Sequence, residues 1–108
     1  MNGTVIEFAP IRLAKGRTEA ELIAASDAFQ RDFLAGQPGF LSRELVRKGE
    51  GEYADIVRWK SQADAAAIMD RIEGSPAVAA FFSVMAIGDA DAAGCVEHYT
   101  SLARYGLA

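Results

Sequence analysis

A single histidine and a single tryptophan are the side chains of this sequence best suited to chemistry. Histidine titrates near neutrality, so His98 in "VEHYT" is the natural proton acceptor of a catalytic site. Trp59, which ends "YADIVRW", could stack on a planar ligand while its indole N–H finds an acceptor. Each also has a purely structural alternative: Trp59 could fill the gap between a sheet and a helix, and His98 could be a structural histidine.

A carboxylate near the amino terminus is the second candidate for proton transfer. Glu7 lies between Ile6 and Phe8 in "VIEFAPIRL", so strand alternation points it away from both neighbours. On an interior face Glu7 would need a cationic partner, or it would hold a proton and could act as a base. On an open face it would simply be solvated or ion-paired.

Four further side chains could bind a substrate. Arg43 could orient an anionic group, and the Tyr53 hydroxyl could donate a hydrogen bond. Met69 and Phe82 fall in helical segments and could form the wall of an apolar pocket. Each again has a structural alternative: Arg43 as part of a polar hairpin row, Tyr53 as an ordinary strand residue, and Met69 and Phe82 as core packing.

Several common chemical sites are absent from the sequence. It has no GxSxG motif, no glycine-rich phosphate loop and no paired Cys or His at metal-ligand spacing. We therefore expect neither a metal nor a cofactor. The one cysteine, Cys95, excludes an intramolecular disulfide and is expected to be a small buried hydrophobe.

Composition indicates one soluble globular domain over residues 1–108. The chain is 51% hydrophobic and 24% charged, with a formal net charge of −4, which argues against a general nucleic-acid binder. No apolar run approaches the roughly 20 residues that cross a bilayer. The beginning, "MNGTVIEFAP", lacks the features of a signal peptide, so a cytoplasmic location without membrane partners is expected.

The first half of the chain predicts a strand, a helix and a turn. Residues 5–13 favour a strand, which should be an edge or bulged at Pro10 because proline cannot donate to a ladder. A helix begins after Thr18, with Glu21 completing a capping box. Gly36 is expected to take the left-handed conformation at its end, and Pro38-Gly39 stops it.

The second half predicts a hairpin, a broken helix and a last strand. Residues 40–48 and 53–59 alternate in polarity around the turn "GEG". Ser61 caps an alanine-rich helix, and Ser75-Pro76 restarts it after Gly74. A loop over residues 88–94 then leads to a strand over residues 95–105.

This β-α-β-β-α-β order is the α+β, ferredoxin-like arrangement with an antiparallel sheet and helices on one face. Apolar residues occur at both parities of the strands, for example Tyr53 and Trp59 against Ile56. The second face therefore also needs covering, and we expect a homodimer whose two sheets pack face to face as a dimeric α/β barrel.

With these elements in place, the sequence resembles the dimeric α+β barrel proteins grouped with the antibiotic biosynthesis monooxygenases. The resemblance rests on "QPGF" after the first helix, "VRWKS" at the end of the third strand and "VEHYT" in the last strand. Members of that family include cofactor-independent oxygenases of aromatic polyketides and heme-degrading monooxygenases. The heme-degrading branch uses an Asn in the first strand and a Trp and a His in the second helix. Here Glu7 stands in the first strand and the second helical region has neither, so heme degradation is not expected.

The resemblance implies a cofactor-independent monooxygenase acting on a small phenol or quinol in a pocket between sheet and helices. His98 or Glu7 would remove the phenolic proton, and Trp59 would hold the ring. An alternative is a non-catalytic dimeric barrel that binds an apolar or aromatic small molecule or responds to stress. In a third possibility the dimer itself is the functional unit, and Trp59, Phe81 and Phe82 fill the space beside the helices.

Overall fold

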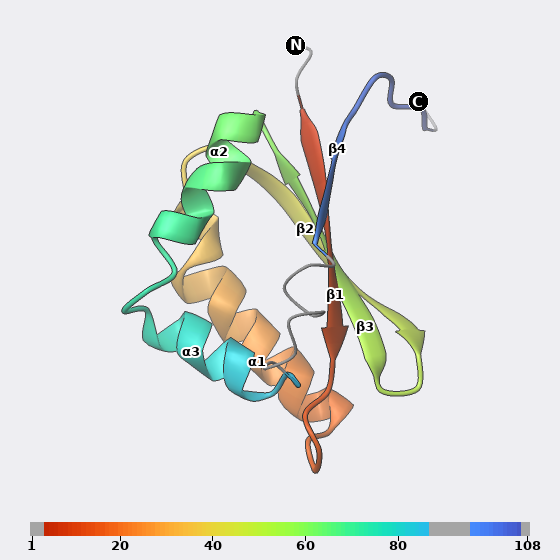
Figure 1. Cartoon of the computed structure of the whole chain (residues 1–108), viewed down its shortest axis with the longest axis vertical. Helices are drawn as coiled ribbons and strands as arrows, with labels where there is room; N and C mark the ends of the chain where they lie inside the picture. The colour runs from red at the N-terminus through yellow and green to blue at the C-terminus, as the bar shows by residue number, and fades with distance from the viewer. Residues whose placement is uncertain (1–3, 87–95, 107–108) are drawn as a thin grey trace.

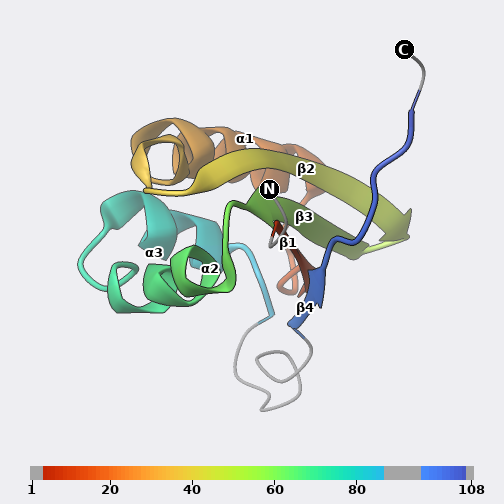
Figure 2. The same cartoon turned by 90° about the horizontal axis from the view of Figure 1, so that it is seen from above.

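Four antiparallel strands form one sheet in the order β2-β3-β1-β4, with three helices on one side of it (Figures 1 and 2). The structure is a computed structural model, and it describes residues 4–86 and 96–106. Its strands are β1 (Val5–Arg12), β2 (Phe40–Gly49), β3 (Glu52–Trp59) and β4 (Glu97–Thr100), and its α-helices are α1 (Glu19–Asp32), α2 (Gln62–Ala67) and α3 (Pro76–Ser83). Short 3₁₀ turns, Leu34–Gly36 and Ile68–Asp70, follow α1 and α2. The predicted ferredoxin-like order is confirmed.

The helix α1 begins where its capping residues predict. Glu21 N donates to Thr18 Oγ1 at 3.2 Å, and Thr18 N donates to Glu21 Oε1 at 2.8 Å. The prediction for its carboxyl end was wrong, because Gly36 lies within the 3₁₀ turn and it is Gly39 that has a positive φ, +80°. A side chain at Gly39 would also collide with Asp64, so both the backbone conformation and the available space require glycine here.

Pro10 lies at a local edge of the sheet, as predicted. Strand β4 pairs with β1 only over Val5 to Phe8, whereas β3 pairs with β1 along its whole length without a register shift. Pro10 therefore faces a ladder partner on one side only among the described residues, which accommodates its missing N–H.

Two register shifts in β2 decide which of its side chains point inward. They fall between Phe40 and Ser42 and between Arg47 and Gly49. Phe40 consequently pairs with Trp59 and Arg43 with Val57, so both lie on the helix-covered face although three positions separate them. Leu41, which simple alternation places in the row of Arg43, lies in the shifted segment and is 46% exposed.

The last strand is shorter than the predicted range of residues 95–105. Its only partner among the described strands is β1, and Thr100 lies opposite Val5, the first residue of that strand. Beyond Thr100 a backbone hydrogen bond follows, from Ser101 N to the Thr4 carbonyl at 2.8 Å, and then Leu102 and Tyr105 are 92% and 90% exposed. Cys95 and the predicted loop over residues 88–94 lie outside the described residues.

The core fills the space between the helices and one face of the sheet. One cluster surrounds Trp59, and a second includes Leu22 of α1 and Tyr53 of β3. Met69 and Phe82 were expected as core or pocket-wall residues, but they are 66% and 39% exposed. The expectation of core packing was wrong because Ile68, Val78 and Phe81 occupy the inward positions of these helical turns, whereas Phe82 does line an apolar cleft. None of the helices in the described ranges is long and apolar enough to span a membrane.

Candidate functional site

Three neighbouring strands place Glu7, Trp59 and His98 on the same face of the sheet. Glu7 of β1 pairs with His98 of β4 on one side and with Val57 of β3 on the other. Trp59 lies two residues beyond Val57 and therefore shares its face. This face is covered by the helices (Figure 1), and the registers place all three residues toward the amino-terminal end of β1.

One carboxylate oxygen contacts both aromatic nitrogens. Trp59 Nε1 donates to Glu7 Oε1 at 3.1 Å, and His98 Nε2 lies 3.6 Å from the same oxygen. The Glu7 side chain is 18% exposed and that of His98 is 33% exposed, so the chain of contacts runs from the core to the solvent. The three residues singled out from the sequence are thus brought together.

Trp59 contributes its N–H to this arrangement and keeps its ring in the core. The residue is 1% exposed, and Phe40 packs edge-on against the indole with 6.0 Å between ring centroids. Its ring faces are therefore covered, and the predicted stacking on a substrate finds no free surface here. The bond to Glu7 satisfies the buried indole nitrogen and fixes one oxygen of the carboxylate.

The geometry suits proton transfer through the imidazole. When His98 Nε2 carries the proton and faces Glu7, Nδ1 is left as the proton acceptor. A protonated His98 would form an ion pair with the Glu7 carboxylate, whose oxygen lies 3.6 Å from Nε2. A base beside a carboxylate that a third group holds in place is an order of groups that general-base catalysis uses.

Arg43 is buried in an ion pair with Asp55 and does not belong to an exposed polar row. Its Nη2 lies 3.0 Å and 3.1 Å from the two Asp55 oxygens and donates to Ser26 Oγ at 2.7 Å. The rings of Phe29 and Phe81 lie 5.0 and 5.2 Å from the guanidinium carbon. Burial raises the pKa of Asp55; Arg43 opposes this rise and the charge of Glu7 adds to it.

Asp55 and Ser26 were not recognised in the sequence, although a signal was present. Asp55 lies on the same face of β3 as Tyr53, Val57 and Trp59, at every second position. Ser26 lies on the apolar face of α1. A carboxylate in an inward-facing row requires a cation, and Arg43 on the adjacent strand is the available one.

Tyr53 lies at the far end of β3 from Trp59 and belongs to a different cluster. Its hydroxyl donates to Glu19 Oε1 at 2.9 Å, and Arg47 binds both Glu19 oxygens at 2.8 Å. Six residues of strand, about 20 Å, separate Tyr53 from Trp59. The cluster therefore ties the start of α1 to the hairpin and is not part of the proton-transfer site.

We expect Glu19 to make the protein more stable above about pH 4.5 than at lower pH. The hydrogen bonds from Arg47 and Tyr53 lower the pKa of Glu19 from 4.5 to about 2. A lowered carboxyl pKa contributes stability above the unfolded pKa, and this is lost as the pH falls through the folded value. Urea denaturation of Glu19→Gln and wild type should differ near neutral pH and converge between pH 4.5 and 2. Glu50→Gln, exposed in the hairpin turn, is the control, and an equal gap across this range would contradict the assignment.

Met69 and Phe82 also lie away from Glu7 and His98. Phe82 lines a separate apolar cleft of about 450 Å³ at the start of α3, together with Ile72, Pro76 and Val78. Met69 projects from the 3₁₀ turn after α2. Of the seven predicted site residues, the structure gathers Glu7, Trp59 and His98, and it distributes Arg43, Tyr53, Met69 and Phe82 elsewhere. Within the described ranges no group of three or more acidic, His or Cys side chains could hold a metal ion.

Solved structures with this fold include oxygenases. SnoaB, a cofactor-independent oxygenase from Streptomyces nogalater, has a TM-score of 0.62 at 20% identity, with 97% of each chain covered. A protein of Caulobacter crescentus CB15, provisionally named an antibiotic biosynthesis monooxygenase, has a TM-score of 0.66 at 19% identity, covering 94% of this chain and 92% of that one. A heme-degrading protein of Mycobacterium tuberculosis, solved heme-free and cleaved, has a TM-score of 0.64 at 21% identity, covering 95% and 96%.

Neither a family model nor a curated protein matches the sequence. At identities near 20% the structural likeness establishes the fold, and one fold hosts many reactions. The predicted resemblance to the antibiotic biosynthesis monooxygenases is confirmed at that level.

Proposed function

We propose that this chain, which has the fold of the antibiotic biosynthesis monooxygenases, is a cofactor-independent oxygenase of a small phenol or quinol. The observation that carries the proposal is the chain of contacts from Trp59 through Glu7 to His98. It joins a solvent-accessible proton acceptor to a carboxylate that the core holds in place. SnoaB, with the same fold, is named a cofactor-independent oxygenase.

The reaction starts with removal of the phenolic proton by His98 Nδ1, while Glu7 stabilises the imidazolium. The resulting electron-rich anion gives one electron to O₂, and the two radicals combine in a C–O bond at a ring carbon that carries hydrogen. That carbon loses its proton and the O–O bond breaks, leaving a quinone carbonyl and releasing water. Four electrons leave the substrate and reduce O₂, so one oxygen atom enters the product and the other enters water. The protein's part is to orient the phenol and to accept its proton.

The test is oxygen consumption with a panel of hydroquinones, naphthols and hydroxylated three-ring aromatics. We expect at least one to be converted with one O₂ consumed per product, and ¹⁸O₂ to place one labelled atom in the quinone. Heat-denatured protein provides the background rate. Saturable binding of panel members without conversion above this background would contradict the oxygenase proposal and favour a small-molecule-binding role.

A homodimer is part of the proposal because no described element of the chain covers the second face of the sheet. The helices cover the face of Glu7 and Trp59, whereas Phe8 and Ile56 pair on the opposite face and are only half-buried. Tyr99 is 51% exposed on that face. Burying this apolar surface against a second copy stabilises the pair, in line with the expected barrel.

We expect the protein to show about twice its chain mass of 11.5 kDa in light scattering, and Phe8→Asp to show the single-chain mass. Met69→Asp makes a similar change of an apolar residue on the helical side and should remain dimeric. A single-chain mass for the wild type at micromolar concentration would overturn the homodimer.

A further inference from the structure

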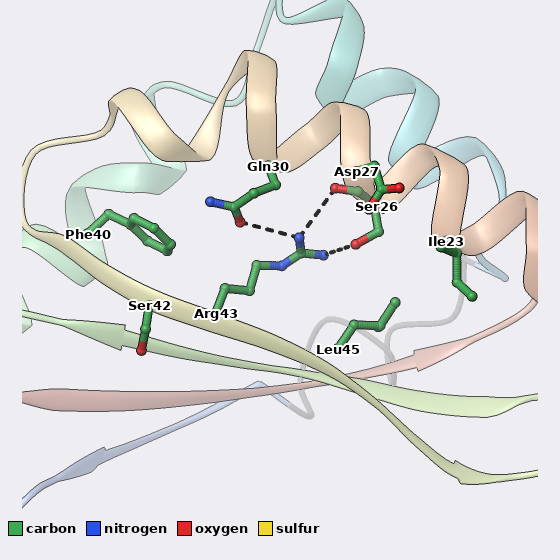
Figure 3. Close-up of a pocket in the computed structure, with 8 residues that line it drawn as sticks. All are labelled: Ile23, Ser26, Asp27, Gln30, Phe40, Ser42, Arg43 and Leu45. Atoms are coloured by element: carbon green, nitrogen blue, oxygen red, sulfur yellow. Dashed lines mark hydrogen bonds between the residues drawn. The ribbon is translucent and has the colours of Figure 1, made fainter.

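A cleft between α1 and the edge strand β2 is separate from the proton-transfer site. It measures about 610 Å³, within the range of small-molecule sites, and its lining includes Ile23, Ser26 and Gln30 of α1 and Phe40, Arg43 and Leu45 of β2 (Figure 3). Neither Glu7 nor His98 lines it. A ligand in this cleft would therefore not contact the residues of the proposed reaction.

The polar floor of the cleft contains a buried donor without a partner. Arg43 Nη1 donates to the Ser26 carbonyl at 3.3 Å and lies 3.5 Å from Gln30 Oε1, and Nη2 is bound to Ser26 and Asp55. Within the described residues Arg43 Nε has no hydrogen-bond partner, although its side chain is only 5% exposed. Buried unpartnered donors are rare in proteins, so this one calls for an acceptor.

Gln30 supplies a second donor at the same place. Its carboxamide oxygen is directed toward Arg43, and Figure 3 shows its amide nitrogen on the side away from the guanidinium. A ligand oxygen that accepts from Gln30 Nε2 would lie beside Arg43. Because Nε is covered in the free protein, the Arg43 side chain must shift toward that oxygen to share it.

The charges around the cleft favour a neutral ligand. The charge of Arg43 is offset by Asp55 in direct contact, and Asp27 adds an exposed carboxylate to the lining. An anionic ligand would meet Asp27 with no uncompensated cation to attract it. Ser42 completes the lining, and its apolar walls are the side chains of Ile23, Phe40 and Leu45, which suit a flat hydrocarbon body.

We propose that this cleft binds a small neutral molecule with an apolar, planar body and a carbonyl or carboxamide oxygen that accepts from Gln30 and Arg43. The probe is 2-naphthamide, followed by ¹H–¹⁵N correlation spectra in which arginine Nε–H signals are observed directly. We expect saturable shifts of the Arg43 Nε–H signal and of the backbone amides of residues 23–30 and 40–45. The charged analogue 2-naphthoate should bind about tenfold more weakly.

Matched variants locate the binding. Gln30→Leu removes the donor but keeps the volume and should weaken 2-naphthamide about fivefold, and Ile23→Trp fills the cleft and should abolish saturation. Asp27→Asn should strengthen 2-naphthoate and leave 2-naphthamide unchanged. Phe82→Ala, in the other cleft, should have no effect.

Two results would overturn the proposal. One is the absence of saturable shifts in these segments up to the solubility limit of 2-naphthamide, which would leave ordered water as the partner of Arg43 Nε. The other is binding that Ile23→Trp and Gln30→Leu leave unchanged. The same spectra report whether each variant is folded. Loss of the saturable shifts can therefore be attributed either to weaker binding in the cleft or to unfolding.

Discussion

Replacing Asp55 with alanine is expected to lower the free energy of unfolding by about 3–5 kcal/mol, the cost of breaking a buried ion pair by removing one partner. The Arg43 and Asp55 side chains are 5% and 8% exposed, so neither charge has water as an alternative partner. Without Asp55, the guanidinium would keep only Ser26, the Gln30 oxygen and the faces of Phe29 and Phe81.

The direction of the Asp55 pKa shift shows where that cost arises. Burial raises this pKa, and Arg43 only partly opposes the rise, so the native environment favours the charged carboxylate less than water does. The pair therefore adds little net stability compared with an apolar core, and most of the loss in Asp55→Ala comes from leaving Arg43 without its counter-ion.

Urea denaturation of four proteins measures this prediction: wild type, Asp55→Ala, Arg43→Met and the double variant Arg43→Met/Asp55→Leu. We expect the double variant to be more stable than either single variant, because it leaves no buried charge. Two results would show that water reaches the pair and screens it. One is a double variant whose loss in free energy of unfolding equals the sum of the two single losses, and the other is a loss below about 1 kcal/mol in Asp55→Ala.

The order of the elements could be predicted from local signals. The capping box at Thr18 and Glu21, the alternation around "GEG" and the Ser75-Pro76 restart each depend on residues adjacent in sequence, and each is confirmed. The extent of the last strand could not be predicted in this way. It is set by its partner, since the ladder ends where Thr100 meets the first residue of β1.

The site could be predicted only in part, for a similar reason. Residue type alone singled out Glu7, Trp59 and His98, and strand parity brings them to one face because no register shift intervenes along β1. The sequence indicated Arg43 as a substrate-binding residue or as part of a polar hairpin row, and neither matches its buried position. That position depends on the register shift near Leu41 and on the facing helix residue, Ser26, and both are non-local. The sequence could not predict that the Trp59 ring is buried while its N–H binds Glu7, since this depends on how Phe40 packs against the ring.

Replacing His98 with alanine should reduce kcat/KM on a phenolic substrate by about 10²–10⁴-fold, the usual contribution of a general base. Glu7→Gln should cause a smaller loss, because the amide still accepts the indole hydrogen bond but no longer stabilises the imidazolium. Trp59→Phe removes the donor to Glu7, together with part of a buried ring, and should lower kcat/KM least of the three. Tyr105→Phe, at a residue 90% exposed beyond the last strand, is the control and should leave kcat/KM unchanged.

The acidity of the substrate distinguishes a base from a structural histidine. If His98 takes the phenolic proton, the loss in His98→Ala should shrink along a series of increasingly acidic phenols and nearly vanish for one already ionised at the assay pH. A structural role predicts the same proportional loss for every member of the series. A constant ratio of wild-type to variant kcat/KM would therefore remove His98 from the mechanism, and a falling ratio would assign it the proton-transfer step.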